Sequence, residues 1–279
     1  MKRCTLHWVA CGSCSHPEFM TQKSASLCPT DFPSHVAIIC HPDHGVILFD
    51  TGYDPEFLKV TRTFPECLYR WTTPITLGDS VAEKLLQMGF SCDDVSAVVI
   101  SHFHGDHVSG LHHFPNARIF CSKMGLDMVR KGNRFTRICK GLLSSLVPVN
   151  IEERSKYFED FAPVILPSVF SPFTIATDLL GDGSLLAIEL PGHCAGHWGM
   201  ALRTQGDRYI ILVADAVWNI SAIEKRLPPP RITTAFLGNT NKYRETLSSL
   251  HDLYKAQRDV ILLPSHCKTS AYNFKISGS

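Results

Sequence analysis

Alternating apolar and polar runs divide the first half of the chain into short strands and helices. Apolar, β-rich runs at residues 36–40 and 46–49 flank the turn-rich segment 41–45, and this arrangement predicts a hairpin. The second run ends at Asp50-Thr51-Gly52, where we expect a sharp turn. Apolar positions at helical spacing predict a helix over residues 80–88, and Gly89 is suited to end it.

The same alternation continues to the C-terminus. It predicts strands at residues 95–100, 117–121, 185–190, 200–203, 209–213 and 260–263, a helix after Ser122 and a long helix over 243–257. Between about residues 130 and 182, four prolines interrupt a segment rich in Phe and Leu, which is either an excursion over the core or part of a substrate pocket. Strands separated by helices indicate an α/β layered fold, and we expect a single domain over residues 1–279.

The composition narrows the classes of partner. Lys plus Arg number 27 and Asp plus Glu 26, so charge gives no reason to expect a nucleic acid or an anionic membrane as partner. The apolar runs fall well short of the ~18 residues that a membrane span needs. The short run before Cys11 is too polar for a signal peptide, so we expect a cytoplasmic protein, with no indication of its oligomeric state.

Eleven cysteines show no framework of paired spacings, and we interpret them as mostly reduced thiols. Cys11 and Cys14 have the C-x-x-C spacing of a zinc or redox pair. Because no second such pair follows, we favour coincidence over a structural metal site.

Histidines are the informative part of the composition, since several of the 14 are clustered. The strand predicted at 95–100 leads into Ser101 and then His102-Phe-His-Gly-Asp-His107. In extended backbone, residues two apart point the same way, so His102 and His104 can bind one ion. Gly105 permits a change of direction that lets Asp106 and His107 face a second position. Imidazoles with one carboxylate suit zinc, and also iron, manganese or cobalt.

Further candidate ligands follow three other predicted strands. His193 comes after the strand at 185–190, Asp215 ends an apolar strand, and His266 follows the strand at 260–263. Rigid sheets gather such strand-end side chains at one edge. A single Asp can bridge two cations, so the seven residues predict a two-metal hydrolase centre.

Neighbouring residues with metal-binding side chains are interpreted differently. We expect His197 to be a structural hydrogen-bonding residue, and Cys194 and Cys267 to be buried inert thiols, because adjacent residues in extended chain point apart. We place His112 and His113 on a helix after the cluster.

The ordered set of ligands resembles the metallo-β-lactamase superfamily. His102-Phe-His-Gly-Asp-His107 matches the H-x-H-x-D-H motif, and Asp50-Thr51-Gly52 resembles the early D-T-G turn that supports the ligand loops. The resemblance covers roughly residues 35–270. It implies an αββα sandwich of two facing mixed β-sheets flanked by helices. It also implies two zinc ions, one held by His102, His104 and His193, the other by Asp106, His107 and His266, with Asp215 bridging.

Within that superfamily the chain looks most like the acyl-homoserine lactone lactonases. Gly12-Ser-Cys14 and the segment Pro191-Gly-His-Cys-Ala-Gly-His197 resemble their G-x-C and P-G-H-x-x-G-H patterns. Those lactonases often place a tyrosine three residues beyond the bridging Asp, whereas this chain has Trp218, a candidate substrate-binding residue without a hydroxyl.

The resulting hypothesis is a dinuclear zinc-dependent hydrolase acting on a small molecule. A metal-bridging hydroxide would attack an ester-like carbonyl, with a lactone carrying a hydrophobic acyl substituent as the leading candidate, and Asp106 would also accept or relay a proton. Thioester hydrolysis, of the glyoxalase II type or on a carrier-bound acyl group, is the main alternative. Phosphotriester hydrolysis and a non-catalytic, metal-containing ligand-binding protein are further alternatives.

Aromatic and apolar residues in two segments are candidate walls for a substrate tail, although ordinary core packing is the favoured interpretation. They are Phe57, Phe64, Leu68, Tyr69, Trp71, Phe170 and Phe173.

Overall fold

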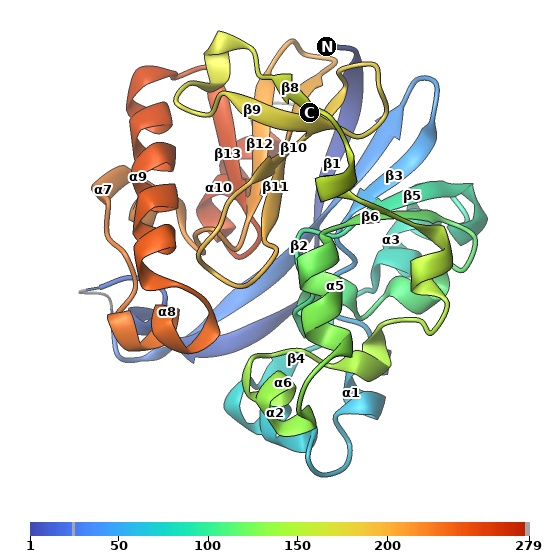
Figure 1. Ribbon diagram of the computed structural model, residues 1–279, viewed down its shortest axis with the longest axis vertical. Coiled ribbons are helices and arrows are strands. Elements are labelled where there is room, and N and C mark those ends of the chain that lie inside the picture. The colour runs from blue at the N-terminus through green and yellow to red at the C-terminus, as the bar shows by residue number, and fades with distance from the viewer. Residues whose placement is uncertain (24–25, 277–279) are drawn as a thin grey trace. The chain divides into compact units, whose positions relative to one another are not determined.

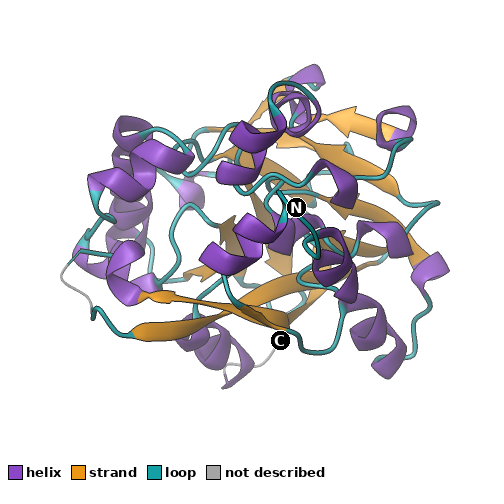
Figure 2. Ribbon diagram, turned by 90° about the horizontal axis from the view of Figure 1, so that it is seen from below, coloured by secondary structure: helices purple, strands orange, loops and turns teal. Residues whose placement is uncertain are grey.

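The computed structural model describes residues 1–23 and 26–276, and it divides into two compact units. The N-terminal unit comprises His7–His16 and Thr30–Tyr157. The C-terminal unit comprises Met1–Leu6, Pro17–Pro29 and the chain from Phe158 onward. The chain contains both helices and strands (Figure 2), and they alternate along the described residues, as the sequence pattern predicts for an α/β protein.

The N-terminal unit contains a mixed sheet in which β2 (Pro29–His41) pairs antiparallel with β3 (Gly45–Phe49). Parallel pairs then join β3 to β5 (Val95–Val99), β5 to β6 (Arg118–Cys121) and β6 to β7 (Ser155–Tyr157). The long strand β1 (Arg3–Pro17) pairs antiparallel with β4 (Ile75–Thr76) at Ser13 and Cys14. The predicted hairpin through residues 41–45 is confirmed, because His41 pairs with Gly45.

The helices of this unit are short. They are α1 (Pro55–Val60), α2 (Cys67–Thr72), α3 (Val81–Gln87), α4 (Gly105–Val108), α5 (Lys123–Arg130) and α6 (Arg134–Cys139), with 3₁₀ turns that include η2 (Cys92–Asp94), η3 (Leu111–His113), η4 (Ser144–Leu146) and η5 (Ile151–Arg154). The helix predicted at 80–88 is confirmed as α3, which Ser80 and Glu83 begin with a reciprocal capping box. Gly89 follows with φ of +83°, a left-handed conformation suited to a helix end.

The C-terminal unit contains a second sheet of mainly antiparallel strands (Figure 1). Its order is β8 (Pro163–Ile165), β9 (Ile175–Asp178), β10 (Leu185–Glu189), β11 (Trp198–Thr204), β12 (Tyr209–Ala214) and β13 (Val260–Pro264). The last pair, β12 and β13, is parallel. The first residues of β1 also pair with the end of β11, at Arg3 and Cys4.

The long helix α9 (Thr240–Ala256) covers this sheet along β12 and β13 (Figure 1). Its buried residues, Tyr243, Leu247, Leu250 and Leu253, recur at helical spacing and pack with apolar residues of β12 and β13 in one core cluster. The remaining helices are α7 (Ile220–Lys225), α8 (Arg231–Leu237), α10 (Lys268–Ile276) and the 3₁₀ turns η1 (Glu18–Met20), η6 (Phe158–Asp160) and η7 (Ser168–Phe170).

Two segments contain elements that the hydrophobic pattern did not predict. Residues 3–17 form strand β1. Helix α6 and strands β7, β8 and β9 lie within the proline-rich segment 130–182. In the part of the chain that the structure describes, no helix is both long and apolar enough to span a membrane.

Candidate metal centre

Four predicted ligands of the N-terminal unit lie directly beyond strand β5. His102 is the third residue after the strand, His104 is the N-cap residue of α4, and Asp106 and His107 occupy the first turn of that helix. All four are buried, His102 and His107 completely. Nε2 of His102 lies 3.0 Å from Nδ1 of His104, so the predicted convergence of these two residues is confirmed.

The chain changes direction at Gly105, as predicted, since it passes there from the extended His104 into helix α4. Gly105 is not among the glycines with a positive φ, so the turn itself does not require glycine. A Cβ at this position would instead lie 2.7 Å from Cε2 of Phe57 and 3.2 Å from Cε1 of Tyr69. Glycine therefore allows two aromatic rings to pack against the loop that carries the ligands.

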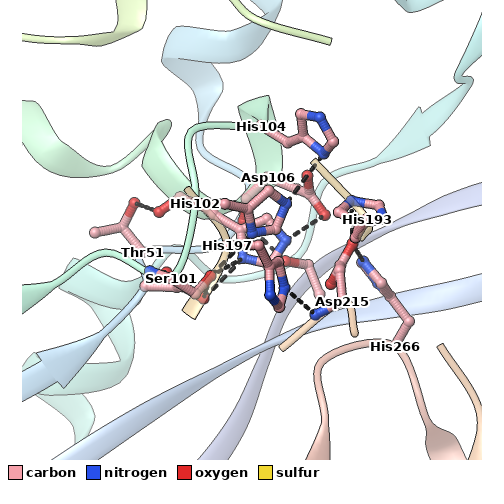
Figure 3. Close-up of polar contacts among 12 residues, drawn as sticks. Thr51, Ser101, His102, His104, Asp106, His193, His197, Asp215 and His266 are labelled. Carbon is pink, nitrogen blue, oxygen red and sulfur yellow. Dashed lines mark hydrogen bonds and ion pairs between the residues drawn. The ribbon is translucent and has the colours of Figure 1, made fainter. Parts of the chain in front are cut away.

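The Asp50-Thr51-Gly52 turn supports that loop, as the family resemblance implied (Figure 3). The carboxylate of Asp50 accepts hydrogen bonds from the backbone N–H of Ser101 at 2.8 Å, from its hydroxyl at 2.7 Å and from Nδ1 of His107 at 2.7 Å. Thr51 donates from its hydroxyl to the carbonyl of His107. Burial raises the pKa of Asp50 above its ordinary value, although His107 and Ser101 act in the opposite direction.

This arrangement fixes the ligand atom of His107. Because Nδ1 donates to Asp50, Nε2 carries the lone pair, and it lies 3.5 Å from Oδ2 of Asp106. Ser101, which sequence analysis did not single out, also contacts Nδ1 of His102 at 3.0 Å. The only sequence signal for Ser101 was its position immediately before His102.

The other three predicted ligands lie together in the C-terminal unit (Figure 3). Because β12 and β13 are parallel and Ala214 pairs with Pro264, the residues that follow them, Asp215 and His266, emerge at the same sheet edge. Oδ2 of Asp215 lies 3.2 Å from Nε2 of His266 and 3.5 Å from Nε2 of His193, which follows β10. All three side chains are buried.

His197 is a structural hydrogen-bonding residue, which confirms the prediction. Its Nδ1 donates to the carbonyl of Leu190 at 2.9 Å, and the backbone N–H of Asp215 donates to its Nε2 at 3.1 Å. Both ring nitrogens are thereby used to hold the two strand ends that carry His193 and Asp215.

The two cysteines next to predicted ligands differ from each other. Cys267 is buried, as predicted, and accepts hydrogen bonds from the N–H groups of Ile220 and Ser270 at 3.4 Å. Cys194 is half-buried rather than buried. Desolvation, with a smaller contribution from Asp215, raises the pKa of the Cys194 thiol well above its ordinary value.

Trp218 lies against one of the predicted ligands. Its ring centroid is 4.2 Å from that of His266, with the two planes tilted by 44°. A substrate that reached this part of the C-terminal unit would therefore meet an indole, which can donate through its N–H but supplies no hydroxyl.

The donor sets of both units suit metal ions. Two ligand atoms that share a tetrahedral zinc at about 2.0–2.1 Å lie roughly 3.3 Å from each other. The observed donor separations are 3.0 and 3.5 Å in the N-terminal unit and 3.2 and 3.5 Å in the C-terminal unit. Buried imidazoles and carboxylates at these separations fit zinc, iron, manganese or cobalt.

Buried His and Asp side chains that follow the strands of an α/β protein are the arrangement expected of a metal-dependent enzyme. The sequence model of the metallo-β-lactamase superfamily matches residues 29–256. The chain belongs to this superfamily, and the predicted fold class is confirmed as the metallo-β-lactamase fold.

Comparisons with individual proteins agree with this assignment. A probable metallo-hydrolase of Mycobacterium tuberculosis is 22% identical over 254 residues, which cover 83% of this chain and 75% of that protein. The N-acyl homoserine lactonase AiiB of Agrobacterium fabrum is 25% identical over 245 residues, covering 85% and 80%. A solved N-acyl homoserine lactone hydrolase, with the product N-hexanoyl-L-homoserine at its catalytic metal centre, has a similar fold. Its TM-score is 0.73 at 16% identity, and the match covers 98% of this chain and 97% of that one.

Proposed function

We propose that this protein is a metal-dependent hydrolase that opens lactones carrying a hydrophobic acyl group. Membership of the metallo-β-lactamase superfamily, together with the similarity to a lactonase, supports the general enzyme class, a lactonase-like metal-dependent hydrolase. The main structural support for this proposal is the two sets of buried His and Asp donors at the ends of strands. The similarity to the lactonase AiiB and to the solved lactone hydrolase supports a lactone as the substrate.

We further propose that both donor sets form one dinuclear metal centre. His102, His104 and His193 would hold one ion, Asp106, His107 and His266 the other, and Asp215 would bridge them. Residues 1–279 would then act as one domain with one active site. Two zinc ions suit these donors best, and when bound they supply a water-derived nucleophile near neutral pH and polarise the substrate carbonyl.

The protein's own residues would prepare and protect this chemistry. Asp50 and His197 hold the rings and strand ends that present the ligands, so little reorganisation is needed during the reaction. Asp106 has a buried carboxylate that can accept a proton and return it to the leaving alkoxide. Cys28 and Cys139, which are exposed thiols, fit a reducing compartment such as the cytoplasm.

The presence of Trp218 favours thioester hydrolysis as the second candidate function. A lactonase of the type that the chain resembles often uses a tyrosine hydroxyl at this position to orient the lactone carbonyl. Loss of one well-placed donor to an oxyanion typically costs ~10²–10³ in rate. A thioester carbonyl can be attacked by the same two-metal chemistry without that hydroxyl.

Steady-state kinetics on parallel substrate panels tests the choice. The zinc-loaded protein would be assayed on homoserine lactones of increasing acyl length and on acyl thioesters, phosphotriesters and a β-lactam, with the chelated protein as control. We expect measurable lactone turnover that rises with acyl hydrophobicity. Negligible lactone opening with strong thioester turnover would replace the substrate assignment, and no turnover on any panel would favour a non-catalytic binding protein.

Exchange of Trp218 for tyrosine probes the same question at one residue. Trp218→Tyr would restore the hydroxyl at the position next to His266, so lactone kcat should stay unchanged or rise. A matched change, Phe236→Tyr, also adds a hydroxyl to a ring, at an exposed position of α8, and should leave turnover unchanged. A large loss of lactone kcat in Trp218→Tyr alone, at full metal content, would contradict the proposed role.

A further inference from the structure

A second cluster of metal-binding side chains lies within the N-terminal unit, outside the seven ligands. Asp54 precedes helix α1, and His112 and His113 form the end of the 3₁₀ turn η3. The Asp54 side chain is buried, whereas the side chains of His112 and His113 are 40% and 31% exposed. A buried carboxylate is therefore paired with two imidazoles that solvent can reach.

Both imidazoles point their Nε2 atoms at the same carboxylate. Nε2 of His113 lies 2.8 Å from Oδ2 of Asp54, and Nε2 of His112 lies 3.7 Å from Oδ1. The two ring centroids are 4.0 Å apart. Adjacent residues in a 3₁₀ turn are separated by about a third of a turn, so their side chains ordinarily diverge. Here they converge on one point.

Hydrogen bonds around the cluster orient its donor atoms. Nδ1 of His112 donates to the carbonyl of Ser109 at 3.1 Å, which leaves the lone pair of the neutral ring on Nε2. Oδ1 of Asp54 accepts the N–H of Glu56 at 2.9 Å. Partial burial opposes ionisation of Asp54, yet the bonds from His113 and Glu56 keep its pKa below the ordinary value, so it is a carboxylate at neutral pH.

A hydrogen bond to Asp54 accounts for the position of His113 but not for that of His112. The separation of 3.7 Å between Nε2 of His112 and Oδ1 of Asp54 is too long for a hydrogen bond. When the ring proton of His112 lies on Nδ1, as its contact with the Ser109 carbonyl requires, the Nε2 lone pair faces the Asp54 carboxylate, which is unfavourable unless a positive charge lies between them. A cation shared by the three groups removes this conflict, and the two separations bracket the roughly 3.3 Å expected for donors on one ion.

We propose that Asp54, His112 and His113 form a third, mononuclear site for a divalent transition-metal ion, with water at the remaining positions. Two imidazoles and one carboxylate favour zinc, nickel or copper over magnesium or calcium. The site does not depend on the proposed hydrolase function, because none of its ligands belongs to the seven-residue set. An ion here would link the start of α1 to η3 and stabilise the folded N-terminal unit by mass action.

Zinc titration of the full-length protein, already loaded with its tightly held metal, tests this site. Metal content per chain and the thermal unfolding midpoint would be measured as free zinc rises through the micromolar range at pH 7.5. We expect one additional zinc per chain and a parallel rise in the unfolding midpoint. In His112→Asn this additional binding should weaken about tenfold or more, with basal metal content and hydrolysis unchanged.

Two further variants complete the test. His113→Asn should behave like His112→Asn, whereas His251→Asn, a change in a half-buried histidine of α9, should bind the additional zinc as the unchanged protein does. If His113→Asn lowers stability without zinc, the exposed His112 still provides the comparison. The proposal is wrong if the unchanged protein takes up no additional zinc, or if His112→Asn takes it up with the same affinity.

Discussion

Asp50 holds the main ligand loop through three hydrogen bonds from residues that lie more than fifty positions further along the chain. Its φ of +65° lies in the left-handed region, which Asp and Asn tolerate better than most residues. The side chain is completely buried. A single substitution can therefore remove the negative charge of Asp50 while keeping the size of its side chain.

Asp50→Asn should keep the turn but weaken metal binding. The amide keeps the size of the carboxylate and suits the positive φ, yet it lacks the charge that orients His107 and offers one acceptor oxygen in place of two. Loss of such a supporting group typically costs about 10–100-fold in metal affinity. Competition with a chromogenic chelator measures this, and Asp79→Asn, at an exposed carboxylate paired with Lys84, is the control. Equal affinities in both variants would show that Asp50 does not support the ligands.

At the scale of single residues, the sequence predicted the metal ligands better than the residues that hold those ligands in place. His102, His104, Asp106 and His107 were found because they lie within six positions, and the spacing alone suggests their chemistry. Ser101 acts through Asp50, and His112 and His113 act with Asp54, 59 residues before His113. Such partners meet only when the chain folds, so local spacing contains no signal for them.

The loop of residues 191–197 shows how one element positions another within the C-terminal unit. Gly192 has a φ of +131°, and a Cβ at this position would overlap the backbone N and Cα of Tyr243 at the start of α9. The carbonyl of Gly192 accepts the N–H of Asn239, and the carbonyl of Pro191 accepts the hydroxyl of Thr246. The first turns of α9 thus hold the loop that presents His193.

Gly192→Ala should therefore destabilise the protein and displace His193. Backbone strain and overpacking each cost about 1–3 kcal/mol, so we expect a loss of at least about 2 kcal/mol in the free energy of unfolding. Urea unfolding measures it. Gly206→Ala is the matched control, because its nearest neighbour would be Oγ1 of Thr204 at 3.9 Å, and its change should stay within about 1 kcal/mol. Equal stability of the two variants would contradict the close approach at Gly192.

Helices α2 and α6 are linked by an ion pair whose strength depends on pH. Nε and Nη2 of Arg134 each donate to a carboxylate oxygen of Glu66 at 2.7 Å. Partial burial raises the pKa of Glu66, but the bonds from Arg134 outweigh this and hold it below its ordinary value near 4.5. A lowered folded-state pKa means that the stabilisation is complete above that ordinary value and is lost as pH falls through the folded pKa.

Glu66→Gln should remove this part of the acid sensitivity. Stability at neutral pH should fall slightly, and the difference between the variant and the unchanged protein should shrink as pH drops below about 4.5. Urea midpoints measured from neutral to acid pH follow the change, with Glu159→Gln as a control. A difference that grows toward acid pH would reverse the sign and contradict the ion pair.

The elements were predicted where their pattern is local and strong. The hairpin of β2 and β3, the capped helix α3 and the strands β10, β12 and β13 were found within a few residues of their observed bounds. Strand β1 was missed although Cys4, Leu6 and Trp8 alternate as buried residues, because polar residues interrupt the run. The elements of residues 130–182 are short, and strands β7 to β9 form through pairing with other strands.

At the scale of the whole molecule, the order of the ligands along the chain is itself sufficient to indicate the superfamily. Each donor set lies within one unit, and the parallel pairing of β12 with β13 explains why Asp215 and His266 meet. The order of the ligands does not identify the substrate, because a fold does not determine which molecule a site accepts. That choice depends on side chains such as Trp218, which the ligand motif does not specify.

Metal content per chain tests the central claim, one dinuclear centre, most directly. Protein purified without added metal would be analysed for transition metals beside Asp215→Ala and Cys194→Ala, with folding checked by circular dichroism. We predict close to two ions per chain in the unchanged protein and in Cys194→Ala, and a clear loss of metal in Asp215→Ala, which removes the bridging carboxylate. Saturation at one ion per chain, or equal metal retention in Asp215→Ala and Cys194→Ala, would contradict the account.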